Sequence, residues 1–194
     1  GAPTTSATTS SNVGTYDITQ GTLALTDNGT FKASNYTMNY VKGTLTITKA
    51  KATKPTVTAY NKAYDGASHG VTVSGGSGGT VKYSTDNSTW TETAPTYKDF
   101  TNGAKTVYVK VVGDSNHSDS DVVTSSITIS KKSITVTADN KSRAYGAANP
   151  TFTATVGATG VTGETGKVSG APTTSATTTS DVGTYDITQG TLAS

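Results

Sequence analysis

The sequence contains no cysteine, which excludes a disulfide framework and a thiolate metal site. Charged residues make up only 14% of the chain and the net charge is +2, which is too small and too dispersed for a nucleic-acid-binding surface. No apolar run approaches the roughly 18 residues needed to cross a membrane. Hydrophobic residues are also scarce, at 32% of the 194 residues. The lack of cysteine is compatible with an oxidising exterior but proves no compartment, and the lack of a membrane-spanning run carries no weight in an interior window of a long protein.

The few apolar residues are patterned, which argues against disorder. They alternate with polar or small residues, and a period of two is the mark of strands with one buried face. No stretch has the spacing of three to four residues that an amphipathic helix requires. We therefore predict an all-β fold. The alternating sets are Leu45 and Ile47, Ile127 and Ile129, Ile134 and Val136, and Val107, Val109 and Val111.

Turn signals separate the alternating runs. Asn28-Gly29 and Asn102-Gly103 are typical of two-residue hairpin turns, because asparagine and glycine tolerate positive φ angles. Asn28-Gly29 should connect a strand at 23–25 to Phe31, and Asn102-Gly103 should connect 97–100 to 106–112. The glycine-rich stretch 75–79 and the stretch 86–88 are expected to be further turns.

The first 24 residues return near the end of the chain. Residues 1–24 and 170–193 differ at two positions only, Ser10 against Thr179 and Asn12 against Asp181. This near-identity at an offset of 169 residues indicates a window cut from a tandem array, whose ends lie inside a repeating module. Such arrays serve as spacers, stalks and multivalent surfaces more often than as enzymes.

A weaker internal repeat sets the expected boundaries. Residues 56–66 resemble 135–146, and 43–50 resemble 125–132, so each module opens and closes with a similar strand. We expect the N-terminal segment (1–50) to be the C-terminal part of one module. The central segment (51–132) should be a complete module, and the C-terminal segment (133–194) the N-terminal part of the next.

Ordered motifs in the two outer segments resemble the MBG family of bacterial surface-protein repeats, in its Tyr-Gly variant. They are Tyr145-Gly146, Asn149-Pro150, 170–172, 182–187, Asn35-Tyr36 and 43–47. The central segment, with 64–66 and 83–86 before Trp90, resembles immunoglobulin-like repeats. The resemblance implies an immunoglobulin-like sandwich flanked by two partial MBG-type β-modules in a rod-like array. It implies an extracellular bacterial adhesin or filament and no catalytic residues.

Candidate sites are few. His69 and His117 lie in polar loop contexts and are interpreted as solvated. The run 113–121 offers Asp114, Asp119 and Asp121 as weak calcium ligands, since hard cations prefer carboxylate oxygens. It lacks a spaced calcium-loop pattern, so a polar hairpin is the favoured interpretation. No acid/base cluster or nucleophile motif is present, so we expect no catalytic site, no cofactor and no enzyme activity.

Two further possibilities concern the tyrosines and lysines. Five tyrosines and the single tryptophan gather in the central segment, and they either bind a glycan or receptor or, as we favour, fill a core poor in leucine. They are Tyr60, Tyr64, Tyr83, Trp90, Tyr97 and Tyr108. A Lys–Asn isopeptide bond has candidates in Lys42, Lys82 and Lys110, but Lys110 alternates with valines and should face outward.

The leading hypothesis is a structural repeat segment of a giant secreted surface adhesin or filament. The alternative is a multivalent module whose repeats each bind a glycan or a host or matrix protein weakly. The expected partners are neighbouring repeats, head to tail. Residues 1–50 should dock onto 133–169 of a neighbouring copy, or of the preceding repeat in the native protein, because each partial module leaves strand edges unpaired.

Overall fold

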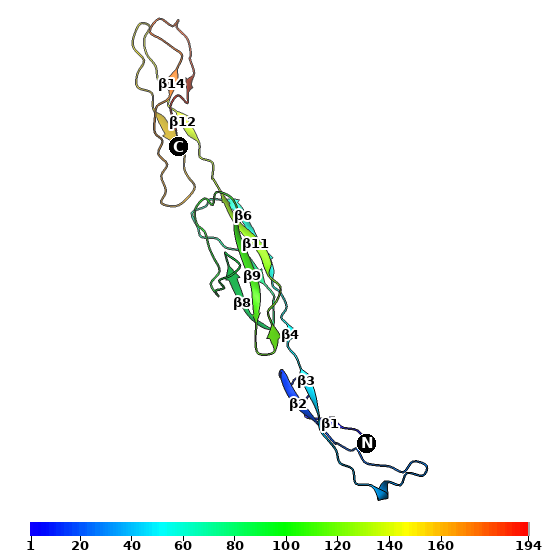
Figure 1. The fold of residues 1–194 in the computed structure, drawn as a ribbon. Helices are drawn as coiled ribbons and strands as arrows, with labels where there is room; N and C mark the ends of the chain where they lie inside the picture. The colour runs from blue at the N-terminus through cyan, green and yellow to red at the C-terminus, as the bar shows by residue number, and fades with distance from the viewer. Residues whose placement is uncertain (194) are drawn as a thin grey trace. The chain divides into compact units, whose positions relative to one another are not determined.

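The computed structural model describes residues 1–193, and within them the chain is all-β with a single 3₁₀ turn, η1 at Ala33–Asn35 (Figure 1). This confirms the predicted fold class. The chain forms two compact units. Unit 1 contains Gly1–Tyr60, Gly70–Thr96 and Lys105–Ile127, and unit 2 contains Asn61–His69, Tyr97–Ala104 and the residues from Thr128 on.

A three-stranded antiparallel sheet forms the first part of unit 1. Its order is β1 (Thr4–Thr5), β2 (Gly14–Thr19) and β3 (Gly43–Ile47). β2 is the central strand, and β3 pairs with it from Gly14↔Ile47 to Ile18↔Gly43. The alternating run at Leu45 and Ile47 is therefore a strand, as predicted.

The largest sheet has four strands in the order β6-β11-β9-β8. These are β6 (Tyr60–Ala63), β8 (Gly79–Ser84), β9 (Lys105–Gly113) and β11 (Val123–Ser130). The largest fully buried side chains all come from the two central strands, because only they have a neighbour on each edge. They are Val107, Val109 and Val111 of β9 and Ile127 and Ile129 of β11.

The other face of β9 carries Lys110, as its alternation with the valines predicts. Its side chain is nevertheless only 18% exposed. The Nζ atom lies 2.7 Å from Asp119 Oδ2 and 4.6 Å from the centroid of the Trp90 ring. The predicted face is the one observed, and an ion pair and an aromatic ring, which the alternation does not indicate, cover the stem and the head group.

Small sheets complete unit 1. β5 (Thr56–Thr58) pairs antiparallel with β7 (Thr72–Ser74), and β4 (Ala50–Lys51) pairs parallel with β10 (His117–Ser118). The glycine-rich turn after β7 lies against the valine face, since a Cβ atom at Gly76 would be 3.0 Å from Val111 Cγ2 and 3.4 Å from Pro55 Cβ. The immunoglobulin-like sandwich assigned to 51–132 stays a prediction.

Unit 2 contains two short antiparallel pairs: β12 (Val136–Ala138) with β13 (Ala154–Val156), and β14 (Thr173–Thr174) with β15 (Ile187–Thr188). Val136 is in a strand as predicted, but Ile134 precedes the strand and is 40% exposed. Alternation alone overextended this strand: the pairing ends with the Gly157 N–H, which donates to the Thr135 carbonyl at 2.8 Å, and does not reach Ile134.

The two Asn-Gly turns differ. Asn102 and Gly103 both have positive φ angles, 44° and 99°, as expected for these residue types. The predicted hairpin between 97–100 and 106–112 is wrong, because β9 pairs with β8 and β11 and Tyr97 instead forms a bridge with His69. At Asn28-Gly29 only the glycine has a positive φ, 55°, and the bridge joins Asn28 to Phe31, so the turn is shifted by one residue. Residues 23–25 are not a strand. The Asp27 side chain accepts the Ala33 N–H at 2.9 Å and so holds the backbone in a local turn.

Candidate functional site: the junctions and the open groove

The first junction links the N-terminal segment to the central segment within unit 1. It is centred on the loop 113–121, which contains β10. The N–H of Ala50 donates to the Asn116 carbonyl at 3.0 Å, and the N–H of Ala52 donates to the Ser118 carbonyl at 2.9 Å. The chain that connects the segments is thus a strand of a parallel pair and not a free linker.

The Asn116 side chain binds a second strand end at the same place. Its Oδ1 accepts the N–H of Val13 at 2.9 Å, and its Nδ2 donates to Asn12 Oδ1 at 2.8 Å. The Asn116 side chain therefore accepts one hydrogen bond and donates another, and both link the residues just before β2 to the loop 113–121. At the second copy of the repeated sequence Asp181 replaces Asn12 and keeps an acceptor oxygen at this position.

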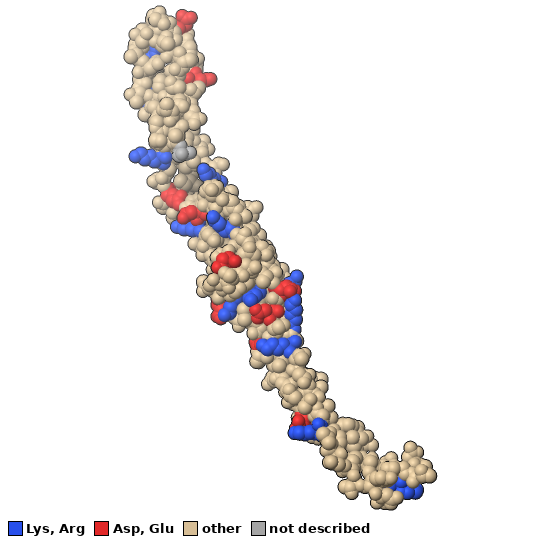
Figure 2. Space-filling model, in the orientation of Figure 1, with Lys and Arg blue, Asp and Glu red and all other residues tan. Residues whose placement is uncertain are grey.

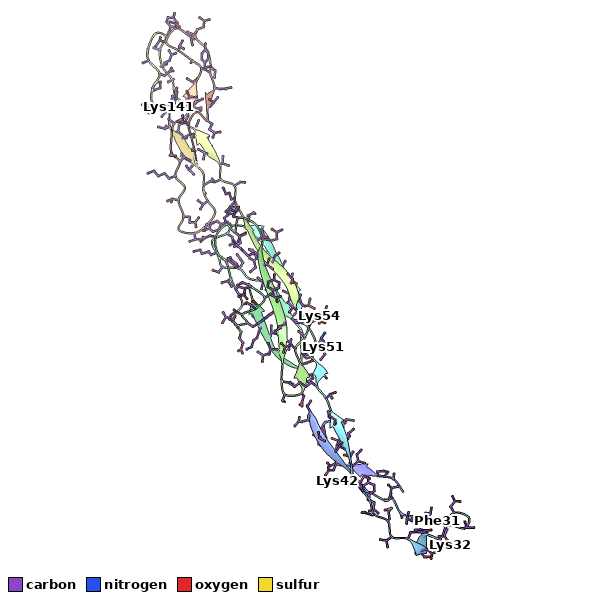
Figure 3. The ribbon with its side chains drawn as sticks, in the orientation of Figure 1. Phe31, Lys32, Lys42, Lys51, Lys54 and Lys141 are labelled. Carbon is purple, nitrogen blue, oxygen red and sulfur yellow. The ribbon has the colours of Figure 1, made fainter. Side chains whose placement is uncertain are left out.

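Lysines reinforce the first junction. Lys49 Nζ donates to the carbonyl oxygens of Asp114 and His117 at 3.0 and 3.3 Å. Lys51 Nζ lies 2.5 Å from Asp121 Oδ1. Lys51, which is labelled in Figure 3, is the second residue of β4. Both side chains of this ion pair are more than half exposed, so it contributes orientation more than stability.

The predicted calcium ligands lie in this loop, and each carboxylate already has hydrogen-bond donors. Asp114 accepts from His117 Nδ1 at 2.7 Å and Asp119 from Lys110 and the Gly113 N–H, while Asp121 binds Lys51. In residues 1–193 no three histidine, aspartate or glutamate side chains gather as a metal site would need. The structure therefore does not bring the three aspartates together around one point.

The second junction lies within unit 2 and links the loop 64–69 and Lys132 to the loop 157–166. The Tyr64 hydroxyl donates to the Glu164 carboxylate, and Lys132 Nζ donates to the Gly160 carbonyl at 3.4 Å. Gly66 has a φ of 82°, and a Cβ atom there would lie 2.4 Å from Val161 Cγ1. A glycine is thus needed at this position both for its conformation and for the close approach of Val161.

Both histidines form hydrogen bonds to an aspartate, although the sequence suggested that they are solvated. His69 Nε2 lies 2.8 Å from Asp65 Oδ1, and the His69 backbone forms a bridge with Tyr97. His117 pairs with Asp114 at the first junction. Each histidine is partly buried and orients a loop through a nearby aspartate. The i+3 and i+4 spacing of these Asp/His pairs was the sequence signal that could have revealed this.

The aspartates of the first junction make a pH test possible. The His117 hydrogen bond lowers the pKa of Asp114, the Lys110 hydrogen bond lowers that of Asp119, and the Lys51 hydrogen bond lowers that of Asp121. A carboxyl group with a lowered pKa stabilises the fold above its unfolded pKa of about 3.9 and loses that contribution as the pH falls through its folded pKa.

We therefore expect the melting temperature to be nearly constant between about pH 5 and 8 and to fall below about pH 4. Circular dichroism melts at a series of pH values check this. Asp121→Asn should show a shallower acid decline than the unmodified chain. A decline that is complete by pH 5 would contradict the assignment.

The five tyrosines and Trp90 of the central segment are half-buried, which agrees with a role in packing, whereas Phe100 is 46% exposed. The exposed tyrosines lie elsewhere, at Tyr36, Tyr145 and Tyr185. Of the lysines considered for an isopeptide bond, Lys42 pairs with Asp17 at 2.6 Å and Lys82 lies 3.8 Å from Glu92. On the face drawn in Figure 2, charges of both signs are interspersed.

An open groove lies within unit 2. It has a volume of about 850 Å³ and runs between residues 140–145 and 182–187, with Phe152 and Thr174 among its other lining residues. Tyr145, of the Tyr-Gly pair noted in the sequence, lies at its first wall, and the following Gly146 has a φ of 78°. Among the described residues no helix has the length and apolar character needed to cross a membrane.

Comparison with known proteins gives one family. The model for the MBG domain (YGX type) matches residues 2–46 and 134–194, which is more than half of the chain and leaves 47–133 outside the match. Neither the curated proteins nor the solved structures give a match. The family match covers the segments whose motifs resembled MBG repeats, and it confirms that resemblance. The chain belongs to the MBG domain family (YGX type), whose domains are typical repeats of bacterial surface proteins.

Proposed function

We propose that this chain is a structural repeat segment of a very large secreted bacterial adhesin or surface filament. Its work is to extend the protein from the cell surface or to build a fibre, with neighbouring repeats as its partners. The family, the duplicated 24-residue sequence and the small, threonine-rich β-sheets support this proposal. No titratable cluster in residues 1–193 suggests chemistry, so we propose no enzymatic role.

The observation that carries the proposal is the double attachment at the first junction. The loop 113–121 binds the connecting strand at Ala50 and Ala52 and also binds the start of β2 through Asn116. Two attachment points separated in sequence resist bending better than one covalent linker, because a rotation about the linker must break the second contact. A spacer that keeps its direction over many repeats needs junctions of this kind.

Asn116→Ala tests the junction with atomic selectivity. The substitution removes the acceptor of the Val13 N–H but keeps the backbone carbonyl that binds Ala50. We expect amide hydrogen exchange to accelerate at Val13 and to stay unchanged at Ala50, as measured by NMR. Asn39→Ala, which alters an exposed asparagine of the same unit outside the junction, is the control. Equal exchange at Val13 in both variants would contradict the role of Asn116.

The stiffness of the first junction can be measured with spin labels attached to introduced cysteines. The sequence contains no native cysteine, so only the introduced positions are labelled. Thr44→Cys and Thr124→Cys place labels on β3 and β11, both within unit 1. We expect one narrow distance distribution, which Asn116→Ala broadens. A broad distribution in the otherwise unmodified chain would show a flexible connection and would contradict the spacer function.

A multivalent binding module is the second candidate, and one observation favours it. The Phe31 and Tyr36 rings stack with centroids 4.7 Å apart, and Tyr36 is 60% exposed. Phe31 is labelled in Figure 3. An exposed aromatic pair is a surface on which a sugar ring can stack. A glycan array probed with the chain distinguishes the two functions: saturable binding that Tyr36→Ala abolishes would favour the binding module, and a blank array would favour the spacer.

A further inference from the structure

The chain contains two Asn-Gly pairs, Asn28-Gly29 and Asn102-Gly103, and all four residues are exposed. In such a pair the side-chain amide carbon of the asparagine, Cγ, is an electrophile, and the backbone nitrogen of the glycine is the nearest nucleophile. Because glycine has no Cβ, no side chain obstructs the approach of this nitrogen to Cγ. The two pairs have the same chemistry and the same exposure, so any difference in their reactivity comes from the backbone around them.

The backbone at Asn28 is held by two hydrogen bonds. The Asn28 N–H donates to the Phe31 carbonyl at 3.1 Å, and the Phe31 N–H donates to the Asn28 carbonyl at 2.9 Å. Attack on Cγ requires a rotation about ψ of the asparagine, which moves the asparagine carbonyl together with the glycine nitrogen. At Asn28 this rotation breaks the hydrogen bond from the Phe31 N–H, and the lost bond raises the barrier to attack.

The backbone at Asn102 has no such restraint. Within residues 1–193 no hydrogen bond involves the Asn102 backbone, the Asn102 side chain or the Gly103 N–H. Asn102 has a φ of 44°, in the left-handed region that is unfavourable for a residue with a side chain, so a departure from this conformation relieves strain. No atom lies within 4 Å of the position that a Cβ at Gly103 would take. Neither hydrogen bonding nor packing therefore opposes the rotation that brings the Gly103 nitrogen to Asn102 Cγ.

We propose that Asn102 is a site of spontaneous deamidation in the folded chain. The Gly103 nitrogen bonds to Asn102 Cγ and closes a five-membered succinimide ring, and the side-chain nitrogen leaves as ammonia with the proton of the Gly103 N–H. Water then opens the ring. Cleavage of the new bond to Cγ gives aspartate, and cleavage of the original peptide bond gives isoaspartate, whose backbone runs through the side chain. The net reaction consumes one water, releases one ammonia and needs no enzyme or cofactor.

Isoaspartate at this position changes a buried contact. Thr101 is 4% exposed, and its hydroxyl donates to the Gly103 carbonyl at 2.7 Å while it accepts the Ile129 N–H at 3.1 Å. The isoaspartate backbone has one additional carbon before Gly103, so the Gly103 carbonyl moves away from the Thr101 hydroxyl. The modification thus reaches Ile129, a buried residue of β11, through Thr101. This inference goes beyond the proposed function, because the reaction is the same in a spacer and in a binding module.

The test incubates the full chain at mildly alkaline pH and follows both pairs by peptide mapping with mass spectrometry. Trypsin places Asn102 in the peptide 99–105 and Asn28 in the peptide 1–32, where fragment ions distinguish it from Asn12. We expect Asn102 to gain the mass of deamidation about 2- to 10-fold faster than Asn28 in the folded chain, since only Asn28 must break a backbone hydrogen bond. In urea, where this bond is absent, the two pairs should react at nearly the same rate.

Two variants serve as controls. Asn102→Gln should show no mass gain in 99–105, because the longer side chain would have to close a six-membered ring. Asn102→Asp reproduces the charge of the product with a normal backbone. We expect amide hydrogen exchange at Ile129 to accelerate in the chromatographically separated isoaspartate product and to stay unchanged in Asn102→Asp.

Three outcomes would overturn the proposal: equal rates at the two pairs in the folded chain, a faster reaction at Asn28, or a reaction at Asn102 in urea only. Unchanged exchange at Ile129 in the isoaspartate product would overturn the connection of this turn to β11 through Thr101.

Discussion

Ile127→Ala is expected to destabilise unit 1 by about 2–5 kcal/mol, since it removes a fully buried branched side chain and leaves a cavity. The fully buried apolar core consists of few side chains, so little neighbouring volume can collapse into the space. A domain with a typical stability of about 5–15 kcal/mol would lose a large share of it. The melting temperature should fall by at least about 8 °C.

Ile134→Ala is the matched control, because it is the same substitution at an isoleucine of another alternating run. Ile134 is 40% exposed and precedes β12. Its truncation should change the stability by no more than about 0.5 kcal/mol. Thermal melts followed by circular dichroism compare the two. Equal losses in both variants would show that the burial assigned to Ile127 is wrong.

This pair also shows how far the sequence determines the fold. Alternation predicted strands at both isoleucine pairs, and it placed Ile127 and Ile129 correctly. It could not show that Ile134 lies beyond the last partner of β13, because strand length depends on the neighbour and not on the strand's own residues. The ion pair and the ring that cover Lys110 were missed for the same reason, since Asp119 and Trp90 reach it from other parts of the chain.

The duplicated sequence gives the clearest limit on prediction from sequence. Val13 and Val182 have almost the same local surroundings in sequence, yet one is covered and the other is 92% exposed. A property that differs between identical segments cannot be encoded in the segment. The repeat could therefore be predicted from sequence, but the different exposure of its two copies could not. The groove and the hydrogen bonds of Asn116 required the structure.

Gly66→Ala should open the second junction. The residue has a φ of 82°, where a side chain costs about 1–2 kcal/mol, and a Cβ atom would lie 2.4 Å from Val161 Cγ1. Valine is stiff at χ1, so its methyl group cannot move away without a shift of the loop 157–166. We expect the variant to lose more than the conformational cost alone, and the Tyr64–Glu164 hydrogen bond should break.

Gly146→Ala separates the two contributions, because Gly146 has a φ of 78° and no atom within 4 Å of the added Cβ position. It should lose only the conformational cost of about 1–2 kcal/mol. Unfolding in denaturant gives both losses, and hydrogen exchange across 157–166 shows whether the junction opens in the Gly66 variant alone. Val161→Ala in the Gly66→Ala background should recover part of the difference, because it removes the clashing methyl group. If the two glycine variants were equally destabilised and exchange at 157–166 stayed slow in both, the loop 64–69 would not be held against Val161, and the second junction would be a flexible connection.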